Sequence, residues 1–465
     1  MRSIVRQIAK IGLGAAASLW LSGCQLYDFA TLEPRHYEVN LGSQNVREEL
    51  VLLNVIRASR FEPMNFTAMS KYTASGSLSL GGQASTTIAK AGQSLLTGGP
   101  ASGSTANSFD LVPLDYAEFY DLFLQTLSPV FVNIFVNAGL SREVVFHSLI
   151  DSIDVTLTPA GEQQLRRHLG RPYPKLRFKN DPTNDTWYGE SGPAAFEQCA
   201  LAAAEDKRRA PALNTTQPIP VWAPFYTEFW YSKEHFNDRY NDCNYHKFLS
   251  LLDEAFEYGV TTARATLTPQ QVQAKQASAA QPGQPSGKTR QTLTQTKQTQ
   301  SPSPGGASAP QTEVVLCFDP ALAAIYGKVL KGQFVCPVGG TVKPGTETLL
   351  NQPLKTNLGA YDASMEPVLR SAYGVFQYYG QLLKTNTQVE ISEKGGRATQ
   401  DHWLFRVTNN ISGCFVRVSY GGRNYCVPEK DAGNTKEVLT ILLALVNMSV
   451  PSKSLPTTQS VISNP

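Results

Sequence analysis

The sequence predicts an α+β protein made of two small domains: a helix-rich N-terminal half, and a C-terminal half in which helices pack on an antiparallel sheet. Three observations favour this fold class. Apolar residues recur at helical spacing in both halves, and short segments typical of strands follow one another after residue 385. A Gln-, Pro- and Ser-rich stretch separates the halves. The predicted segments are a signal peptide (1–23), an N-terminal domain (24–263), a disordered linker (264–312), a C-terminal domain (313–450) and a polar tail (451–465).

The N-terminus has the layout of a bacterial secretory signal. Three basic residues and no acid precede the uncharged run IGLGAAASLWL, which is too short to cross a bilayer core of roughly 30 Å. The run ends in LSGC, which resembles a lipobox, so we predict cleavage between Gly23 and Cys24 and lipidation of the Cys24 thiol. Each buried CH₂ contributes about 0.8 kcal/mol, so two or three acyl chains anchor a protein stably. An ordinary cleaved signal and an uncleaved anchor are the alternatives.

The N-terminal half begins with a predicted helix at residues 43–63, in which an apolar stripe ends before a proline. Residues 69–87 alternate small and polar residues with a few apolar ones and predict a weak strand pair. Gly and Ser dominate residues 92–107, which predicts a loop. Strong helical patterns follow at 115–127 and 129–153.

Several local signals mark where these helices start and stop. Pro129 is suited to the first turn of a helix. Gly139 is suited to a left-handed C-terminal cap, and Ser141 to the N-terminal cap of the next helix. Further along, YGESGPAA predicts a turn with Ser191 or Gly192 near the start of a helix at 193–209.

Residues 264–312 contain eleven Gln and no acidic or aromatic residue. Such a segment cannot bury enough apolar surface to offset the entropy lost on ordering, so we expect it to be disordered. The alternative is a long surface loop within a single domain.

In the C-terminal half, Ser364 precedes a predicted helix at 365–384. A second predicted helix, 435–448, follows Asn434, and Glu437 lies three residues later as in a capping box. Because apolar residues surround most of this last helix, it must be buried, and an antiparallel sheet is the surface we expect it to cover. The strands predicted for that sheet are 386–392, 402–409, 414–420 and 423–429.

An even set of cysteines remains after residues 1–23 are removed, and in an exported chain such a set predicts disulfides. Their order favours the neighbour pairs Cys199–Cys243 and Cys317–Cys336. The pairing of Cys414 with Cys426 stays open. A two-residue turn at Gly421-Gly422 places these two cysteines on opposite faces of a hairpin, whereas a three-residue loop aligns them but disrupts the apolar pairing.

Charge and motifs exclude several classes of function. Residues 1–23 hold three of the 41 Lys+Arg and none of the 38 Asp+Glu, so the rest of the chain has 38 of each and lacks the basic excess of a nucleic-acid binder. No CxxC or HExxH occurs, and GGQASTTIAKAG lacks the GK[ST] of a phosphate loop, so we expect no metal and no cofactor. Around Ser191 the spacing of a nucleophile elbow fails because Pro193 replaces the second Gly. The absence of a complete catalytic set favours a non-enzymatic role.

One segment, residues 222–245, is rich in aromatic side chains. Nine aromatics in 24 residues cannot all point inward from one helix, so Trp222, Trp230 and Tyr231 are candidates to stack on sugar rings or to contact a protein partner. The alternative is an aromatic core around a disulfide. The stretch HFNDRYNDCNYH within this region gathers metal-ligand types, but a disulfide-bonded Cys243 among polar residues is the simpler interpretation.

Three stretches of the chain resemble an uncharacterised family of proteobacterial envelope proteins. They are ELVLLNVIRASRFEPMNF, the region from FDLVPLDYAEFYDLF to HSLIDSI, and the region from LFRV through VRVSYGGRNYCVPEKD to LPTT. The family shares a helix like LLLNIVRARY, an entry to paired helices like Y-x-PL-x-G-x-x-F, and a strand like VRYRGYWFYIDDRD before a Leu-rich helix. This chain departs from it at YGGRNYCVPEKD and in its Gln-rich insertion. The resemblance implies an exported or lipidated envelope protein and brings no activity or catalytic residues.

These observations predict a lipoprotein held in the bacterial outer membrane through lipid on Cys24 and facing the periplasm, since Gln25 follows the pattern sent to that membrane. The preferred function is a non-enzymatic scaffold that binds another envelope protein. The alternative is a protein that binds or hydrolyses peptidoglycan or another glycan.

Overall fold

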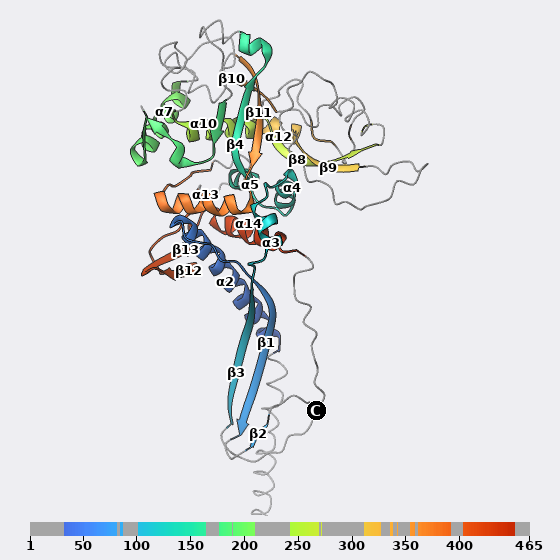
Figure 1. The fold of residues 1–465 in the computed structure, drawn as a ribbon, viewed down its shortest axis with the longest axis vertical. Coiled ribbons are helices and arrows are strands. Elements are labelled where there is room, and N and C mark those ends of the chain that lie inside the picture. Colours follow the sequence, from blue (N-terminus) through green and yellow to red (C-terminus); the bar gives the residue numbers. More distant parts are fainter. Residues whose placement is uncertain are drawn as a thin grey trace, which may run out of the picture.

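The computed structural model describes residues 32–80, 84–86, 101–163, 176–187, 189–209, 242–268, 271, 311–326, 335–337, 342, 354–358, 361–391 and 403–451. The fold is α+β, as predicted. A body of small antiparallel sheets and helices carries one long hairpin, which extends away from it (Figure 1). Helix α2 leaves the body on the same side as this hairpin (Figure 1).

Local signals mark the ends of α4 (Pro129–Asn137) and the start of α5 (Arg142–Leu149). Pro129 is at the start of α4, Gly139 follows that helix with φ +88°, and the Ser141 hydroxyl accepts a hydrogen bond from the Val144 amide, all as predicted. The helices are α2 (Leu32–Ser59), α3 (Ala117–Leu124), α4 (Pro129–Asn137), α5 (Arg142–Leu149), the 3₁₀ helix η1 (Pro182–Asn184), α7 (Pro193–Arg209), α10 (Asn244–Glu257), α12 (Pro320–Tyr326), α13 (Ala372–Thr385) and α14 (Thr435–Met448).

In the part of the chain that the structure describes, the named strands pair in antiparallel fashion, and the largest sheet has the order β10-β11-β4-β5. The strands are β1 (Thr67–Leu80), β2 (Ala84–Thr86), β3 (Ala101–Pro113), β4 (Ile150–Leu157), β5 (Leu176–Lys179), β6 (Thr186–Trp187), β7 (Glu190–Ser191), β8 (Val260–Leu267), β9 (Gln311–Phe318), β10 (Leu354–Leu358), β11 (Tyr361–Leu369), β12 (Cys414–Tyr420) and β13 (Arg423–Pro428).

Two predicted helices were too long, because part of each predicted segment forms a strand instead. Residues 150–153, predicted to end a helix, begin β4, and residues 365–369, predicted to begin one, end β11. These segments pair with each other, with Pro367 opposite Ile153. The cap of α13 is therefore Ser371, whose hydroxyl accepts a 3.0 Å hydrogen bond from the Gly374 amide, and not Ser364. Pro367 is compatible with β11 because β10 pairs only with residues 361–365 and does not reach it.

Other strand predictions also change in the structure. Strand β1 pairs along its length with β3, whose first residues, 101–107, fall in the predicted loop. The predicted pairing within 69–87 is limited to the short strand β2. Small polar residues have weak strand propensity, so pairing between distant segments decides the outcome here. In the C-terminal region, the predicted strands 386–392 and 402–409 contribute isolated bridges, such as Glu390 with Trp403.

Strands on the two sides of the predicted linker, 264–312, pair with each other in the part of the chain that the structure describes. Strand β8 continues to Leu267 and pairs with β9 from Gln311 onward, so both ends of segment 264–312 lie in one hairpin. Strand β11 pairs with β4 from the other half. The division into domains 24–263 and 313–450 stays a prediction, because sequence composition marks an insertion but not which strands pair across it.

One hydrophobic core joins residues from both sides of the insertion. Leu52 of α2, Ile153 of β4, Phe248 of α10, Phe376 of α13 and Leu442 of α14 are all buried in it. Helices α13 and α2 approach closely at Gly380, where a Cβ would lie 2.7 Å from the Cβ of Ala58. This contact requires glycine, since any side chain would push the two helices apart.

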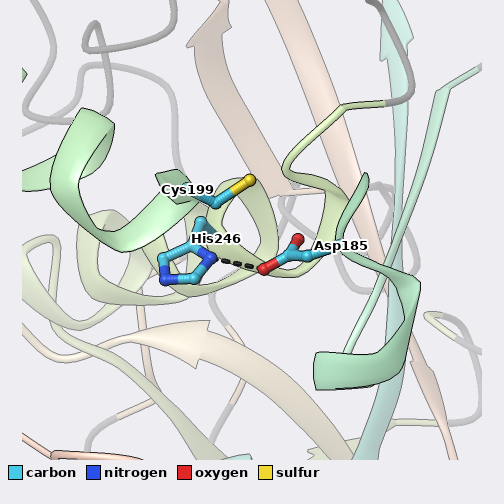
Figure 2. A group of neighbouring side chains, drawn as sticks. All are labelled: Asp185, Cys199 and His246. Carbon is cyan, nitrogen blue, oxygen red and sulfur yellow. Dashed lines mark hydrogen bonds and ion pairs between the residues drawn. The ribbon is translucent and has the colours of Figure 1, made fainter. Parts of the chain in front are cut away.

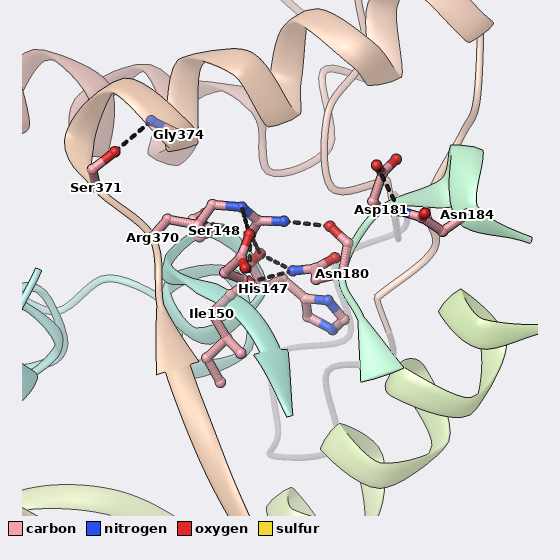
Figure 3. A network of polar contacts seen from close by, with 10 residues as sticks. His147, Ser148, Ile150, Asn180, Asp181, Asn184, Arg370, Ser371 and Gly374 are labelled. Carbon is pink, nitrogen blue, oxygen red and sulfur yellow. Dashed lines mark hydrogen bonds and ion pairs between the residues drawn. The ribbon is translucent and has the colours of Figure 1, made fainter. Parts of the chain in front are cut away.

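Arg370, at the end of β11, is buried and ties the sheet to the helices around it (Figure 3). Its Nη1 donates to the carbonyls of His147 (3.3 Å) and Ser148 (3.2 Å), and also to that of Ile150, while Nη2 donates to the carbonyl of Asn180. The guanidinium carbon lies 4.1 Å from the ring centroid of Tyr378. Burial lowers the pKa of Arg370 from its ordinary value.

Three disulfides link the neighbour pairs of cysteines: Cys199–Cys243, Cys317–Cys336 and Cys414–Cys426. The hairpin around Cys414–Cys426 combines two features that the sequence left as alternatives: the two-residue turn and the alignment of the two cysteines. The hairpin has the two-residue turn and the apolar pairing of Val416 with Val427, but a bulge between Cys414 and Val416 shifts Cys414 opposite Pro428. Residues two apart in a strand share a face, so the bulge moves Cys414 to the face of Cys426.

Candidate ligand-binding cavity

The residues that the sequence singled out for lipidation and for aromatic contacts lie outside the described part of the chain. These are Gly23, Cys24, Trp222, Trp230 and Tyr231. Tyr245, at the end of the aromatic-rich segment, is described, and it is fully buried in the first turn of α10. That one side chain belongs to the core, in agreement with the alternative interpretation of the segment.

The body contains a cavity of about 800 Å³ between the start of α7, the start of α10 and the segment that follows α13. Phe196 and His246 line it from the two helices, Ser191 from the turn before α7, and Glu390 and Trp403 from the other side. Glu390 and Trp403 are held together by an antiparallel bridge. The cavity thus combines aromatic rings with hydrogen-bonding groups, as ligand sites do.

At the cavity, His246 pairs with the buried carboxylate of Asp185. Asp185 directly follows η1; its Oδ1 accepts a 2.7 Å hydrogen bond from the Tyr245 amide, and its Oδ2 lies 2.5 Å from His246 Nδ1. The carboxylate therefore fixes the ring orientation, and Nε2 points away from Asp185 (Figure 2). A histidine oriented in this way is suited to accept a proton at Nε2.

The disulfide Cys199–Cys243 holds this site together. Cys199 is on α7, and Cys243 is the residue before α10, where it adopts a left-handed conformation with φ +54°. The Cys243 amide also donates to the Thr186 carbonyl at 3.1 Å. These contacts fix the start of α10, and with it His246, beside α7 and the hairpin β6–β7.

Asp185, Cys199 and His246 have potential metal-ligand atoms within 4.8 Å of one another (Figure 2). The sulfur of Cys199, however, is bonded to Cys243. A cysteine binds metal as a thiolate, so in this disulfide-bonded form only the carboxylate and the imidazole can act as ligands. Two such ligands do not make the three- or four-ligand set of a zinc site.

Ser191 ends the short strand β7 and is opposite Thr186 in the hairpin β6–β7. Gly192 follows with φ +116°, and Pro193 begins α7, which agrees with the turn that the sequence predicts here. The side chain of Ser191 is exposed and contributes to the cavity lining.

Motif spacing could not predict that Ser191 and His246 line one cavity, because they are far apart in the chain. The predicted pairing of the cysteines did indicate which segments lie near each other. Cys199 comes eight residues after Ser191, and Cys243 comes three residues before His246. A disulfide between these cysteines predicts that the segments around Ser191 and His246 are neighbours.

No protein-family model, curated protein or solved structure matches this chain. Among the described residues, no helix combines the length and the apolar character needed to cross a membrane.

Proposed function

We propose that this chain is a lipid-anchored bacterial envelope protein that binds a glycan of the cell envelope in the cavity. The observation that carries the proposal is the set of side chains in the cavity lining, where Phe196 and Trp403 accompany Glu390 and His246. Sugar rings present apolar faces that stack on aromatic rings, and hydroxyl groups that bond to carboxylate, imidazole and amide groups. Asn386 and Gln388 add amides to the same lining.

The location in the envelope is part of the proposal and depends on the lipobox. Cys24 precedes Leu32, the first described residue of α2, by eight residues. Eight residues reach at most about 29 Å, so lipid on Cys24 would hold the start of α2 close to a membrane. Helix α2 and the hairpin β1–β3 extend from one side of the body, which supports a membrane on that side (Figure 1). Incorporation of labelled palmitate that Cys24→Ser abolishes is the expected result for the anchor.

Pelleting of the purified protein with peptidoglycan tests the glycan site. We expect Trp403→Ala and Glu390→Gln each to reduce the pelleted fraction strongly. The matched control is Tyr373→Ala, which removes an aromatic side chain that is 37% exposed on α13 and does not contribute to the cavity lining. Absence of pelleting, or pelleting that the two cavity variants leave unchanged while they remain folded, would refute the proposal.

A scaffold function is the second candidate, and the long hairpin favours it. In the sheet order β2-β1-β3, the 13-residue strand β3 is at an edge. An edge strand of this length offers backbone groups to which a partner strand can pair. A photo-crosslinking residue at Ser104 of β3 should trap a specific envelope protein in intact cells, while the same residue at the exposed Lys430 should not. Recovery of the protein without a partner from both positions would contradict this function.

A further inference from the structure

The disulfide Cys199–Cys243 holds two sulfur atoms beside the buried pair Asp185–His246. Ligand atoms of Asp185, Cys199 and His246 lie within 4.8 Å of one another (Figure 2). The Cys243 sulfur is bonded to that of Cys199, so it belongs to the same cluster. Reduction of this disulfide therefore leaves two thiols, an imidazole and a carboxylate around one point. Zinc takes four ligands of these types in tetrahedral sites.

Two of the four residues have a spacing that suits a shared ligand. Cys243 directly precedes α10, and His246 lies in the first turn of that helix, three residues later. Both side chains meet α7, because Cys243 is bonded to Cys199 of α7 and the His246 ring centroid lies 4.9 Å from that of Phe196, also on α7. The sequence predicted no metal because it contains no CxxC or HExxH. This set comes from three separate segments, which no single motif can connect.

The carboxylate and the imidazole are already oriented toward each other. Asp185 Oδ1 accepts a 2.7 Å hydrogen bond from the Tyr245 amide, and Oδ2 lies 2.5 Å from His246 Nδ1. A metal ion can take the place of the proton between Oδ2 and Nδ1, while Oδ1 keeps its hydrogen bond and the neutral imidazole carries its proton on Nε2. Hydrogen bonds that orient a ligand in this way strengthen metal sites.

Burial favours a cation at this point once the disulfide is open. Both cysteines are 0% exposed, and Asp185 is 1% exposed. Buried thiolates beside a buried carboxylate need an opposite charge, which a zinc ion supplies. The ion also has a way in, because His246 contributes to the lining of the 800 Å³ cavity.

We propose that the reduced chain binds one zinc ion through four ligands: Asp185, Cys199, Cys243 and His246. The disulfide is then the metal-free, oxidised state of the same site. A dithiol reductant gives two electrons and two protons to the disulfide, which breaks the S–S bond, and the reductant becomes a disulfide itself. The two cysteines bind Zn²⁺ as thiolates and release their two protons. In the reverse direction, a disulfide oxidant takes up two electrons and two protons, the S–S bond forms again, and Zn²⁺ leaves.

The test uses the full-length protein, reduced with a phosphine in the absence of oxygen and titrated with Co²⁺ as a spectroscopic probe for zinc. We expect one Co²⁺ per chain, with a thiolate-to-cobalt charge-transfer band and the strong visible absorption of a tetrahedral site, and Zn²⁺ should displace it. The oxidised protein should show no such band. Replacing Cys199 and Cys243 with Ser should abolish the band. Replacing Cys414 and Cys426 with Ser is the matched control and should leave the band, because that pair belongs to no such cluster among the described residues.

His246→Gln keeps all the cysteines and should weaken zinc binding by at least about a hundredfold. Circular dichroism checks the fold of each reduced protein. If reduction unfolds the wild-type protein, zinc should restore its helical signal but should not restore that of His246→Gln. Reduced protein that binds no stoichiometric metal, metal binding that His246→Gln leaves unchanged, or equal binding by the oxidised protein would overturn the inference. Peptidoglycan pelleting is measured on the oxidised protein, so its outcome is independent of this one.

Discussion

Replacement of Arg370 provides the sharpest test of how the body is held together. Its guanidinium donates to four backbone carbonyls that belong to the end of α5, the start of β4 and the residue after β5. Arg370→Met keeps a long apolar side chain but removes every donor. The carbonyls of His147 and Ile150 keep hydrogen bonds of 2.7 and 2.9 Å from Asn180 Nδ2. Those of Ser148 and Asn180 lose a charged donor.

The expected loss of unfolding free energy in Arg370→Met is the difference between two opposing contributions. A hydrogen bond from a charged group contributes about 1.5–3 kcal/mol, and the three carbonyls at Nη1 share its two N–H groups, so the three N–H groups involved contribute roughly 5–9 kcal/mol. Desolvation of the buried guanidinium, which the variant avoids, opposes this by several kcal/mol. We therefore expect Arg370→Met to lower the free energy of unfolding by about 3–5 kcal/mol. Arg370→Lys, which keeps the charge but not the forked donors, should lose less than Arg370→Met.

Urea unfolding followed by tryptophan fluorescence measures these differences, with Arg417→Met as the control because Arg417 is exposed on β12. We expect the control to change the free energy of unfolding by less than about 0.5 kcal/mol. If Arg370→Met lost no more than the control, the network around Arg370 would have no net stabilising role, and this reasoning would be wrong.

The remaining predictions concern pH, helix packing and the disulfide at the cavity. Burial, with the charge of Arg370 adding to it, lowers the pKa of His147 from 6.5 to about 3. The unfolded chain therefore takes up a proton near pH 6.5 that the folded chain does not. The free energy of unfolding should be highest above pH 6.5 and should fall by about 2 kcal/mol at pH 5 because of this proton. In urea unfolding, His147→Gln should make the free energy of unfolding less dependent on pH in this acid range. Gly380→Ala should lower the melting temperature and reduce the free energy of unfolding by about 1–3 kcal/mol. Gly42→Ala, where a Cβ meets no atom within 4 Å, should raise the melting temperature. Equal effects of the two substitutions would contradict the close contact between the helices. The disulfide Cys199–Cys243 links residues 44 apart in sequence. Replacing both cysteines with Ser should lower the free energy of unfolding by about 4 kcal/mol under oxidising conditions. A loss under about 1 kcal/mol would contradict the role given to this disulfide.

Local signals in the sequence predicted those parts of the fold that local interactions decide. Pro129, Gly139 and Ser141 mark helix ends because each acts within one turn of the chain. The choice between Ser364 and Ser371 as a helix cap is different. Both serines precede apolar residues at helical spacing, and the pairing of β11 with β4, about 200 residues away in sequence, decides between them.

The same limit applies to the cavity. Its residues come from segments that no motif connects, and the pair Asp185–His246 spans 61 residues. The order of the cysteines indicated which segments meet, since Cys199–Cys243 joins the start of α7 to the start of α10. It did not indicate that Asp185 would be the carboxylate beside His246, because that contact depends on how η1 and β6 turn after β5.

The hairpin β8–β9 has a practical consequence. Because Leu267 and Gln311 are directly opposite each other, the polypeptide between them departs and returns at a single point of the body. A break in the backbone between these two residues would leave β4 and β11, one on each side of it, paired in one sheet. The two parts of the chain, expressed as separate polypeptides, are therefore expected to associate through this sheet.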